Sequence, residues 1–344
     1  MRILCMKRIL ICLLSSFCVN MLQIGAQSVD KSDWMALLPD DMLVASVSMP
    51  GAHDAATYKG VLMALGLGRT QVANLSAQWE SGVRAFDLRP AVRDTALHIY
   101  HSVLRTGVSF QDAIQEICVM LDKHPNEFAV VLLRHESESE NEREKLLWPD
   151  AIGRAIEGLG EKAAMFHPQM MVGEMRGKVL FLSRNVYHGT QKGGMVTGWS
   201  HASQGTDNAR IYANGEEAQL QVQDYYAPTT DERRQEKLRG VKKMLSLART
   251  ASQDVWTINF LSGYSKTALG GNATTHGYKV NAQWLHSRLL EETNESSTVS
   301  TGRMGIVFMD FVGMDKVCGG LWHWKAYSVQ SNKLSELVIE SNFR

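Results

Sequence analysis

The sequence predicts an α/β fold, a single distorted (β/α)8 barrel of the TIM type. Short apolar runs alternate with longer segments of helical periodicity, which favours parallel strands joined by right-handed crossovers. Histidine and charged side chains follow several of the apolar runs directly, as they do where strands end at the functional face of a barrel. The chain has 344 residues, of which 44% are hydrophobic, and this is enough for one large core.

The predicted elements follow one another as strand-like and helix-like segments. Short apolar runs are typical of buried strands, and apolar residues three or four positions apart are typical of helices. In chain order we expect strands at 44–49, 82–86 and 96–100, a helix at 109–125, a strand at 127–136, a helix at 142–159, a strand at 178–184, a helix at 230–249, a strand at 254–263, a helix at 281–292 and a closing strand at 302–312.

Individual residues support several of these elements. Phe110 and Ile114 begin the apolar side of the first helix. Pro149 predicts that the second helix breaks or restarts. Thr230 is a candidate N-cap of the longest helix. The long polar stretch 189–209 predicts a loop at the rim of the barrel.

The N-terminus is typical of a signal peptide. Basic residues occur within its first eight positions, and residues 9–19 form an apolar run too short to span a bilayer. We expect cleavage after Ala26, which leaves residues 27–344 as one catalytic barrel. The expected location is therefore secreted or periplasmic.

The cysteines and the charge narrow the possible classes of protein. Cys18 is a candidate lipoprotein anchor, but Phe17 before it is a poor fit to the small residue that lipid attachment prefers. Beyond the signal peptide, Cys118 and Cys318 have no metal-ligand spacing, and we expect buried free thiols, with a disulfide as the alternative. The formal net charge is zero, which argues against nucleic-acid binding.

Five residues in a 50-residue window carry the chemistry. His53 and Asp54 follow the first predicted strand, Asp87 and Arg89 end the second, and His101 ends the third. They supply a base, an acid, a carboxylate to orient each, and a fixed cation. This combination predicts a phosphodiesterase that needs no metal.

These residues could also have purely structural roles. Because Asp87 and Arg89 are two apart in a strand, both point into the barrel, where they could form a buried ion pair that only closes one end. Asp54 could cap a helix that begins near Ala55. The histidines beside them favour the functional interpretation.

These three patches resemble the bacterial phosphatidylinositol-specific phospholipase C family, which shows G-[TS]-H-D-[ST], then F-D-[IL]-R, then an H-H-G-like patch. Here the first patch has Ala52 and Ala55 at its variable positions, and the third has His-Ser. Further segments that match the family lie at 176–185, 220–245, 256–265 and 305–313. The resemblance covers roughly residues 35–340.

The resemblance implies roles for the catalytic residues. His53 would take the proton of the inositol 2-hydroxyl, with Asp310 orienting it. His101, rather than His98, would protonate the diacylglycerol oxygen. Asp87 lies on the neighbouring predicted strand, from which we expect it to orient His101. The product would be inositol 1,2-cyclic phosphate.

The resemblance also implies how substrate and charge are handled. Metal-using relatives have a carboxylate where Arg89 stands, and arginine has no acceptor for a cation, so we expect neither calcium nor any cofactor. The residues expected to bind inositol are Arg134, Arg184, Asp224 and Tyr226. Glu136 is an alternative to Arg134. Each of these residues could instead be an ordinary surface charge.

The expected partner is phosphatidylinositol or a related inositol lipid at a peripheral membrane surface, bound by a monomer. The segment 58–70 is almost uninterrupted in its apolar residues from Val61 to Leu67, which predicts either an interfacial helix or an ordinary core helix. Trp322 and Trp324 are expected to pack in the core.

Three alternatives remain open from the sequence. One is a phosphodiesterase for glycosylated inositol lipids or another inositol phosphodiester. Another is a non-catalytic inositol-lipid-binding module, against which the full set of catalytic residue types argues. The third is a metal-dependent glycerophosphodiesterase, which would need carboxylates where Arg89 stands.

Overall fold

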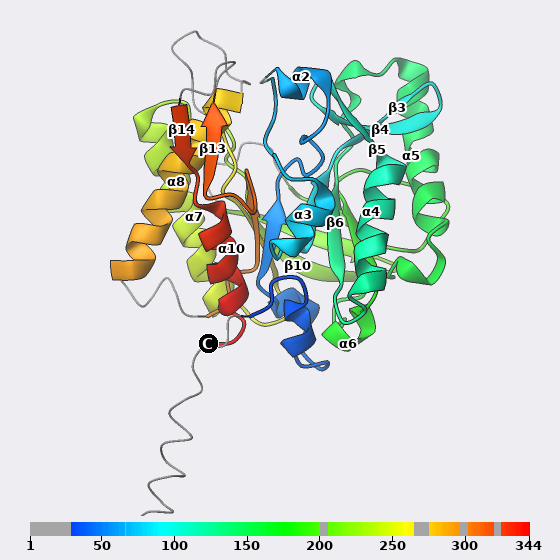
Figure 1. Cartoon of the computed structure of the whole chain (residues 1–344). Coiled ribbons are helices and arrows are strands. Elements are labelled where there is room, and N and C mark those ends of the chain that lie inside the picture. Colours follow the sequence, from blue (N-terminus) through cyan, green and yellow to red (C-terminus); the bar gives the residue numbers. More distant parts are fainter. Residues whose placement is uncertain (1–28, 66, 200–205, 265–274, 296–301, 320–324) are drawn as a thin grey trace, which may run out of the picture. The chain divides into compact units, whose positions relative to one another are not determined.

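Among the described residues, nine strands close into a barrel at the centre of the fold (Figure 1). The computed structural model describes residues 29–65, 67–199, 206–264, 275–295, 302–319 and 325–344. Around the barrel the strands follow the order β1-β12-β11-β10-β9-β8-β7-β6-β2, and β2 pairs with β1. Their bounds are β1 (Met49–Ala52), β2 (Ala85–Leu88), β6 (Ala129–Leu133), β7 (Val179–Ser183), β8 (Gly194–Thr197), β9 (Thr206–Ala213), β10 (Glu216–Gln223), β11 (Trp256–Phe260) and β12 (Ile306–Met309).

The closed α/β barrel is confirmed, but the strands do not follow a regular (β/α)8 pattern. Strand β9 runs antiparallel to both β8 and β10, whereas the other paired barrel strands run parallel. Asn214 and Gly215 connect β9 to β10 as a two-residue turn with φ of 52° and 85°. An Asn-Gly pair favours this hairpin, so no crossover helix is needed. The predicted rim loop at 189–209 therefore contains β8 and the start of β9.

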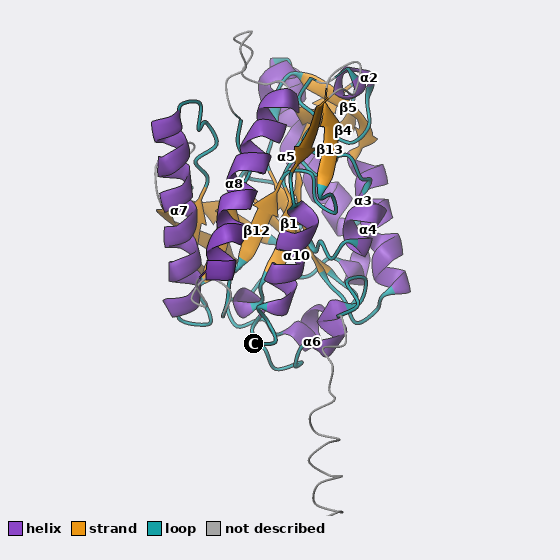
Figure 2. Ribbon diagram, turned by 60° about the vertical axis from the view of Figure 1, so that its left-hand side comes forward, coloured by secondary structure: helices purple, strands orange, loops and turns teal. Residues whose placement is uncertain are grey.

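The longer helices lie outside the barrel (Figure 2). Two short ones, α2 (Val61–Ala64) and α6 (Val172–Met175), lie in connections between strands. The longer helices are α3 (Leu75–Glu80), α4 (Phe110–Lys123), α5 (Glu142–Glu157), α7 (Asp231–Thr250), α8 (Thr275–Glu295) and α10 (Ser331–Glu340).

Capping residues set the starts of several helices. The Thr230 side chain accepts a hydrogen bond from the third residue of α7, which confirms it as the N-cap. A capping box between Asn141 and Glu144 begins α5. The predicted break at Pro149 is wrong, because α5 continues through it. Tertiary packing compensates, since Trp148 is buried and its indole N–H donates to the Pro90 carbonyl at 2.8 Å.

A small antiparallel sheet stands apart from the barrel. It contains β3 (Pro90–Arg93), β4 (Ala96–His101) and β5 (Leu104–Ser109). The third predicted strand, 96–100, therefore belongs to this sheet and not to the barrel. Asp94 and Thr95 both have positive φ and make a two-residue turn, which pairs β3 with β4 locally instead of sending the chain to the barrel wall.

The register of three barrel strands brings distant residues to one place. Strand β1 lies between β2 and β12, and Ala52 pairs with both Phe86 and Met309. The next residue of each strand therefore emerges at the same end of the barrel. Gly51 allows this close approach, because a Cβ there would lie 2.7 Å from the Phe308 ring.

Some predicted segments fall on residues that the structure does not describe, whereas Cys118 and Cys318 are both described. The predicted signal peptide and its boundary after residue 26, together with Trp322 and Trp324, lie outside the described residues. Among the described residues, no helix has the length and hydropathy of a membrane-spanning segment. Cys118 is a buried free thiol as expected, whereas Cys318 is free but exposed.

Candidate active site

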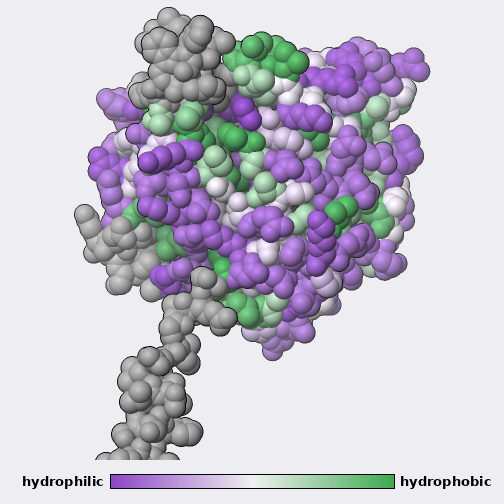
Figure 3. All heavy atoms as spheres, in the orientation of Figure 1, coloured by the Kyte–Doolittle hydropathy of each residue, from purple (hydrophilic) through white to green (hydrophobic). Residues whose placement is uncertain are grey.

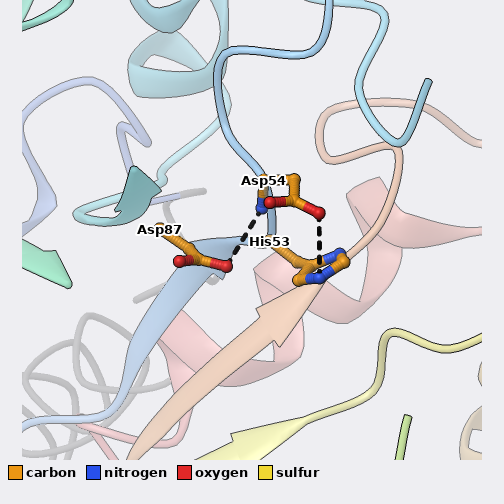
Figure 4. A group of neighbouring side chains, drawn as sticks. All are labelled: His53, Asp54 and Asp87. Carbon is orange, nitrogen blue, oxygen red and sulfur yellow. Dashed lines mark hydrogen bonds and ion pairs between the residues drawn. The ribbon is translucent and has the colours of Figure 1, made fainter. Parts of the chain in front are cut away.

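The structure brings all ten predicted site residues to one cleft at the end of the barrel. The cleft has a volume of about 390 Å³. Three carboxylates lie behind its wall, and Figure 4 shows two of them, Asp54 and Asp87, beside His53. The third is Asp310. The other seven residues line the cleft, and they are His53, Arg89, His101, Arg134, Arg184, Asp224 and Tyr226.

His53 emerges from β1 with both ring nitrogens close to carboxylates. Its Nδ1 lies 2.8 Å from Asp310 Oδ1, and its Nε2 lies 3.2 Å from Asp54 Oδ2. Burial lowers the pKa of His53 well below its usual value and raises that of Asp310, so the pair is best satisfied by one shared proton between Nδ1 and Oδ1. Nε2 is then the atom that can accept a proton.

Arg89 is a fixed cation between two carboxylates. Its Nε lies 2.8 Å from Asp54 Oδ1, and its Nη2 donates to Asp87 Oδ2 at 2.8 Å. Although its burial acts in the opposite direction, these neighbours raise the pKa of Arg89 above its already high value. The guanidinium therefore stays charged and oriented.

His101 is the last residue of β4. Its Nε2 lies 3.4 Å from Asp54 Oδ2, and its Nδ1 lies 2.6 Å from the Gly68 carbonyl oxygen. The prediction that Asp87 orients His101 finds no support in these contacts. Asp87 pairs with Arg89, and Asp54 is the carboxylate beside His101.

Asp54 is shared by both histidines and the arginine. Its backbone has a φ of 45°, and its N–H donates to Asp87 Oδ2 at 3.3 Å. Burial raises the pKa of Asp54 to about 6, against the opposing charge of Arg89. The alternative role as a cap for a helix near Ala55 is wrong, because turns follow and α2 begins only at Val61.

The predicted binding residues form the opposite wall of the cleft. Arg184 Nη1 lies 3.6 Å from Asp224 Oδ2, and its guanidinium lies 4.1 Å from the centre of the Trp199 ring. Burial lowers the pKa of Arg184 to about 10. Trp199 Nε1 donates to the same Asp224 oxygen at 3.1 Å. Tyr226 is exposed at the rim. The wall thus offers charged groups beside aromatic faces.

Arg134 and its alternative, Glu136, both line the cleft. Arg134 Nη1 lies 3.4 Å from Glu136 Oε2, and Arg134 Nη2 lies 3.3 Å from Glu138 Oε1. Glu136 is buried and accepts a hydrogen bond from the Ser102 N–H at 2.7 Å. Arg134 and Glu136 thus form an ion pair in the lining of the cleft.

The sequence reasoning missed three further residues around the site. The Gln71 amide donates to the His53 and Met309 carbonyls at 2.8 and 2.9 Å, which ties the ends of β1 and β12 together. Tyr278 lies beside His101. Lys237 is fully buried on α7. A signal existed for Lys237, since it occupies the apolar stripe of its helix.

Lys237 places a buried amine near the acidic groups. Its Nζ donates to Gln223 Oε1 at 3.2 Å. Burial lowers the pKa of Lys237 to about 7, and the carboxylates of Asp224 and Asp310 oppose the shift. The amine therefore titrates near neutrality.

His53, Asp54 and Asp87 also have ligand atoms close enough to hold a metal ion, all within 4.8 Å of one another. Arg89 already pairs with both carboxylates, so a cation would have to displace a guanidinium held by two contacts of 2.8 Å. The arrangement favours a fixed organic cation over a metal.

Comparisons with known proteins agree with the sequence resemblance. No family model matches the chain. It is 30% identical over 162 residues to the 1-phosphatidylinositol phosphodiesterase of Listeria monocytogenes, a match that covers 46% of this chain and 50% of that protein. The chain thus aligns with about half the length of this curated relative. The predicted resemblance is confirmed.

Solved structures show the shared fold. A phosphatidylinositol-specific phospholipase C from Staphylococcus aureus superposes with a TM-score of 0.66 at 21% identity, covering 91% of this chain and 98% of that one. The corresponding enzyme from Listeria monocytogenes gives a TM-score of 0.62 at 22% identity, covering 91% and 99%. The chain has the same distorted barrel as these structures.

The buried amine of Lys237 predicts how stability depends on pH. The unfolded lysine has a pKa of about 10.4 and the folded one a pKa of about 7, so the unfolded state binds more protons between these values. Burial of the charged amine lowers the free energy of unfolding by its full amount below pH 7. This destabilisation disappears as the pH rises to about 10. Lys237→Met should therefore be more stable than the wild type at pH 7, with the difference shrinking by pH 10. Urea unfolding at both pH values measures this.

The control is Lys243→Met, which changes an exposed lysine of the same helix. It should alter stability little at either pH. A difference between Lys237→Met and wild type that stays constant from pH 7 to pH 10 would contradict the assignment.

Proposed function

We propose that this protein is a phosphatidylinositol phosphodiesterase of the phospholipase C type. One observation carries the proposal: the Nε2 atoms of His53 and His101 lie 3.2 and 3.4 Å from the same oxygen of Asp54, whose other oxygen holds Arg89 at 2.8 Å. A base, an acid and a fixed cation are thus arranged around one carboxylate, as in-line attack on a phosphodiester requires.

The first step forms a bond between the inositol 2-hydroxyl oxygen and phosphorus. His53 Nε2 accepts the hydroxyl proton, while Asp310 holds the Nδ1 side of the ring and balances the charge that develops. Arg89 faces the cleft and stabilises the negative charge on the phosphoryl oxygens. Neutral His53, favoured by its lowered pKa, is the form that can act as base.

The second step breaks the bond between phosphorus and the diacylglycerol oxygen. His101 Nε2–H gives its proton to that oxygen, and the products are diacylglycerol and inositol 1,2-cyclic phosphate. Asp54 stabilises the charged imidazolium before the transfer. The cyclic phosphate can be hydrolysed afterwards, with water taking the place of the leaving alcohol.

The inositol ring is proposed to bind between the charged wall and the tyrosine at the rim. Arg184 and Asp224 present a donor and an acceptor to ring hydroxyls, and Arg134 adds a second donor. Tyr226 is exposed with its ring 6.3 Å from that of Tyr264, which provides a face for the apolar side of the sugar.

A second candidate substrate is a glycosylated inositol lipid. A neighbouring pocket of about 460 Å³ shares Arg134, Glu138 and Arg184 with the cleft. Asn185 and Thr197 line this pocket, together with Trp199. Amide, hydroxyl and aromatic groups suit a sugar, so an inositol ring that carries one has space to extend.

The proposed partner is a membrane surface, reached through α2. Val61, Leu62, Leu65 and Leu67 are 77, 38, 59 and 39% exposed, which argues against a core position for them. Figure 3 shows a hydrophobic patch on the surface over α2. Among the described residues of this segment, Met63 is the buried one. Such a patch beside a catalytic cleft suits insertion among lipid headgroups.

The proposed setting is outside the cytoplasm, in the secreted or periplasmic compartment, and the proposed form is a monomer. The basic start and short apolar run of residues 1–26 support export. The proposed enzyme needs no cofactor.

The acid and base assignment is tested by substitution of each histidine. His53→Ala and His101→Ala should each lower turnover of phosphatidylinositol in mixed micelles about 10²–10⁴-fold while the fold is kept. The cyclic phosphate and diacylglycerol are measured directly. His98→Ala, which lies on the same strand but outside the cleft, should keep near-normal activity. Near-normal turnover in either of the first two variants would sink the mechanism.

Metal independence is tested with a chelator. Because Arg89 neutralises the carboxylates that would hold a cation, activity should survive excess EDTA and should not rise with added calcium. Arg89→Asp should lose activity. Activity that disappears in EDTA and returns with calcium would overturn the metal-free mechanism.

The role of α2 is tested with Leu62→Ser combined with Leu65→Ser. The double variant should bind phosphatidylinositol-containing vesicles more weakly and turn over bilayer substrate more slowly. Hydrolysis of soluble inositol cyclic phosphate and the Tm should hardly change, because both side chains are exposed.

Leu146→Ser on α5 is the matched control, since Leu146 is 79% exposed and lies away from the cleft lining. It should leave vesicle binding unchanged. Burial of each leucine would be worth roughly 1.5–3 kcal/mol. A large fall in Tm for the double variant would therefore support a core role and refute the membrane role.

A further inference from the structure

Tyr278 contacts the proposed general acid from a distant part of the chain. It lies near the start of α8, and its side chain is buried. Its hydroxyl oxygen is 3.2 Å from His101 Nε2, and the two rings are tilted by 45° with centroids 5.7 Å apart. The hydroxyl thus reaches the nitrogen that would donate the proton.

The other side of the imidazole is fixed by the main chain. His101 Nδ1 lies 2.6 Å from the Gly68 carbonyl oxygen, which can only accept a hydrogen bond. Nδ1 therefore carries a hydrogen whether His101 is charged or neutral, and Nε2 is the atom that gains and loses a proton. Within the described residues, the groups in contact with Nε2 are Asp54 Oδ2, at 3.4 Å, and the Tyr278 hydroxyl.

These two neighbours of Nε2 differ in what they can do. An ionised carboxylate can only accept a hydrogen bond. Asp54 can therefore pair with Nε2–H of the charged imidazolium, but not with the bare Nε2 of the neutral ring that remains after proton transfer. A hydroxyl both accepts and donates. Burial raises the pKa of Tyr278 far above its usual value, which keeps the phenol protonated and both capacities available.

We propose that Tyr278 is a positioning residue for His101, accepting from Nε2–H before proton transfer and donating to Nε2 afterwards. This inference rests on the proposed function, because it assigns a role in the step that expels the leaving group. The imidazole then keeps one orientation through the cycle. Its proton points to the cleft, where the leaving oxygen competes with the hydroxyl for it.

Two soluble substrates separate this role from a structural one. One is an inositol phosphodiester with an alkyl alcohol as leaving group, which must be protonated to leave. The other is the matching 4-nitrophenyl ester, whose leaving group departs as an anion. Tyr278→Phe should lower kcat/KM about tenfold for the alkyl substrate and hardly at all for the nitrophenyl substrate.

The ratio of the two rates is the decisive quantity. Both rates come from one preparation, so a smaller folded fraction cancels in the ratio. Tyr327→Phe is the control, since Tyr327 belongs to the same buried cluster as Tyr278 but does not line the cleft. It should leave the ratio unchanged. A Tyr278→Phe variant whose ratio equals that of the wild type overturns the proposal.

His101→Ala distinguishes failure of this inference from failure of the proposed function. Loss of the acid itself should change the ratio more than Tyr278→Phe does. If His101→Ala changes the ratio and Tyr278→Phe does not, only the role of Tyr278 is refuted. If neither changes it, the assignment of His101 as acid is refuted as well.

Discussion

The carboxylate of Asp54 is the group on which the site depends. One side chain contacts both histidines and the arginine, at distances of 3.2, 3.4 and 2.8 Å. Burial of a charge with so many partners is costly unless each contact is satisfied. The raised pKa of Asp54 reflects this cost. The positions of His53, His101 and Arg89 are therefore mutually dependent, because each helps to stabilise the same buried charge.

The fold meets this requirement with two kinds of structure. The barrel supplies the residues at the ends of β1, β2 and β12, whose register is fixed by parallel hydrogen bonding. His101 comes from the small sheet β3–β5. This sheet begins at the residue after Arg89, and turns connect its strands. The proposed base, His53, is thus held by long-range strand pairing, and the proposed acid, His101, by local pairing. Gln71 links the ends of β1 and β12 through their carbonyls.

The sequence predicted the site residues that lie at strand ends. It did not predict the contacts that His101 makes with segments that are far from it in the chain. His53, Asp87 and Asp310 each follow an apolar run, so their common location could be predicted from strand periodicity. The partner of His101 could not, because Asp54 reaches it through a turn with positive φ. The contact of Tyr278 with His101 could not be predicted either, because it joins the start of α8 to the end of β4, far apart in the chain. The hairpin at Asn214 was not predicted, although its Asn-Gly pair is a clear local signal for the turn that the structure shows.

The Gly68 carbonyl that holds His101 has a consequence for how this region tolerates change. Because the acceptor is a main-chain atom, no side chain between Val61 and Leu67 is needed to orient the imidazole. Gly68 itself is confined: its φ is 66°, and a Cβ there would lie 2.9 Å from His101 Nδ1. Side chains of the apolar segment, which is proposed to contact lipid, can therefore be exchanged without removing the acceptor that orients the His101 ring.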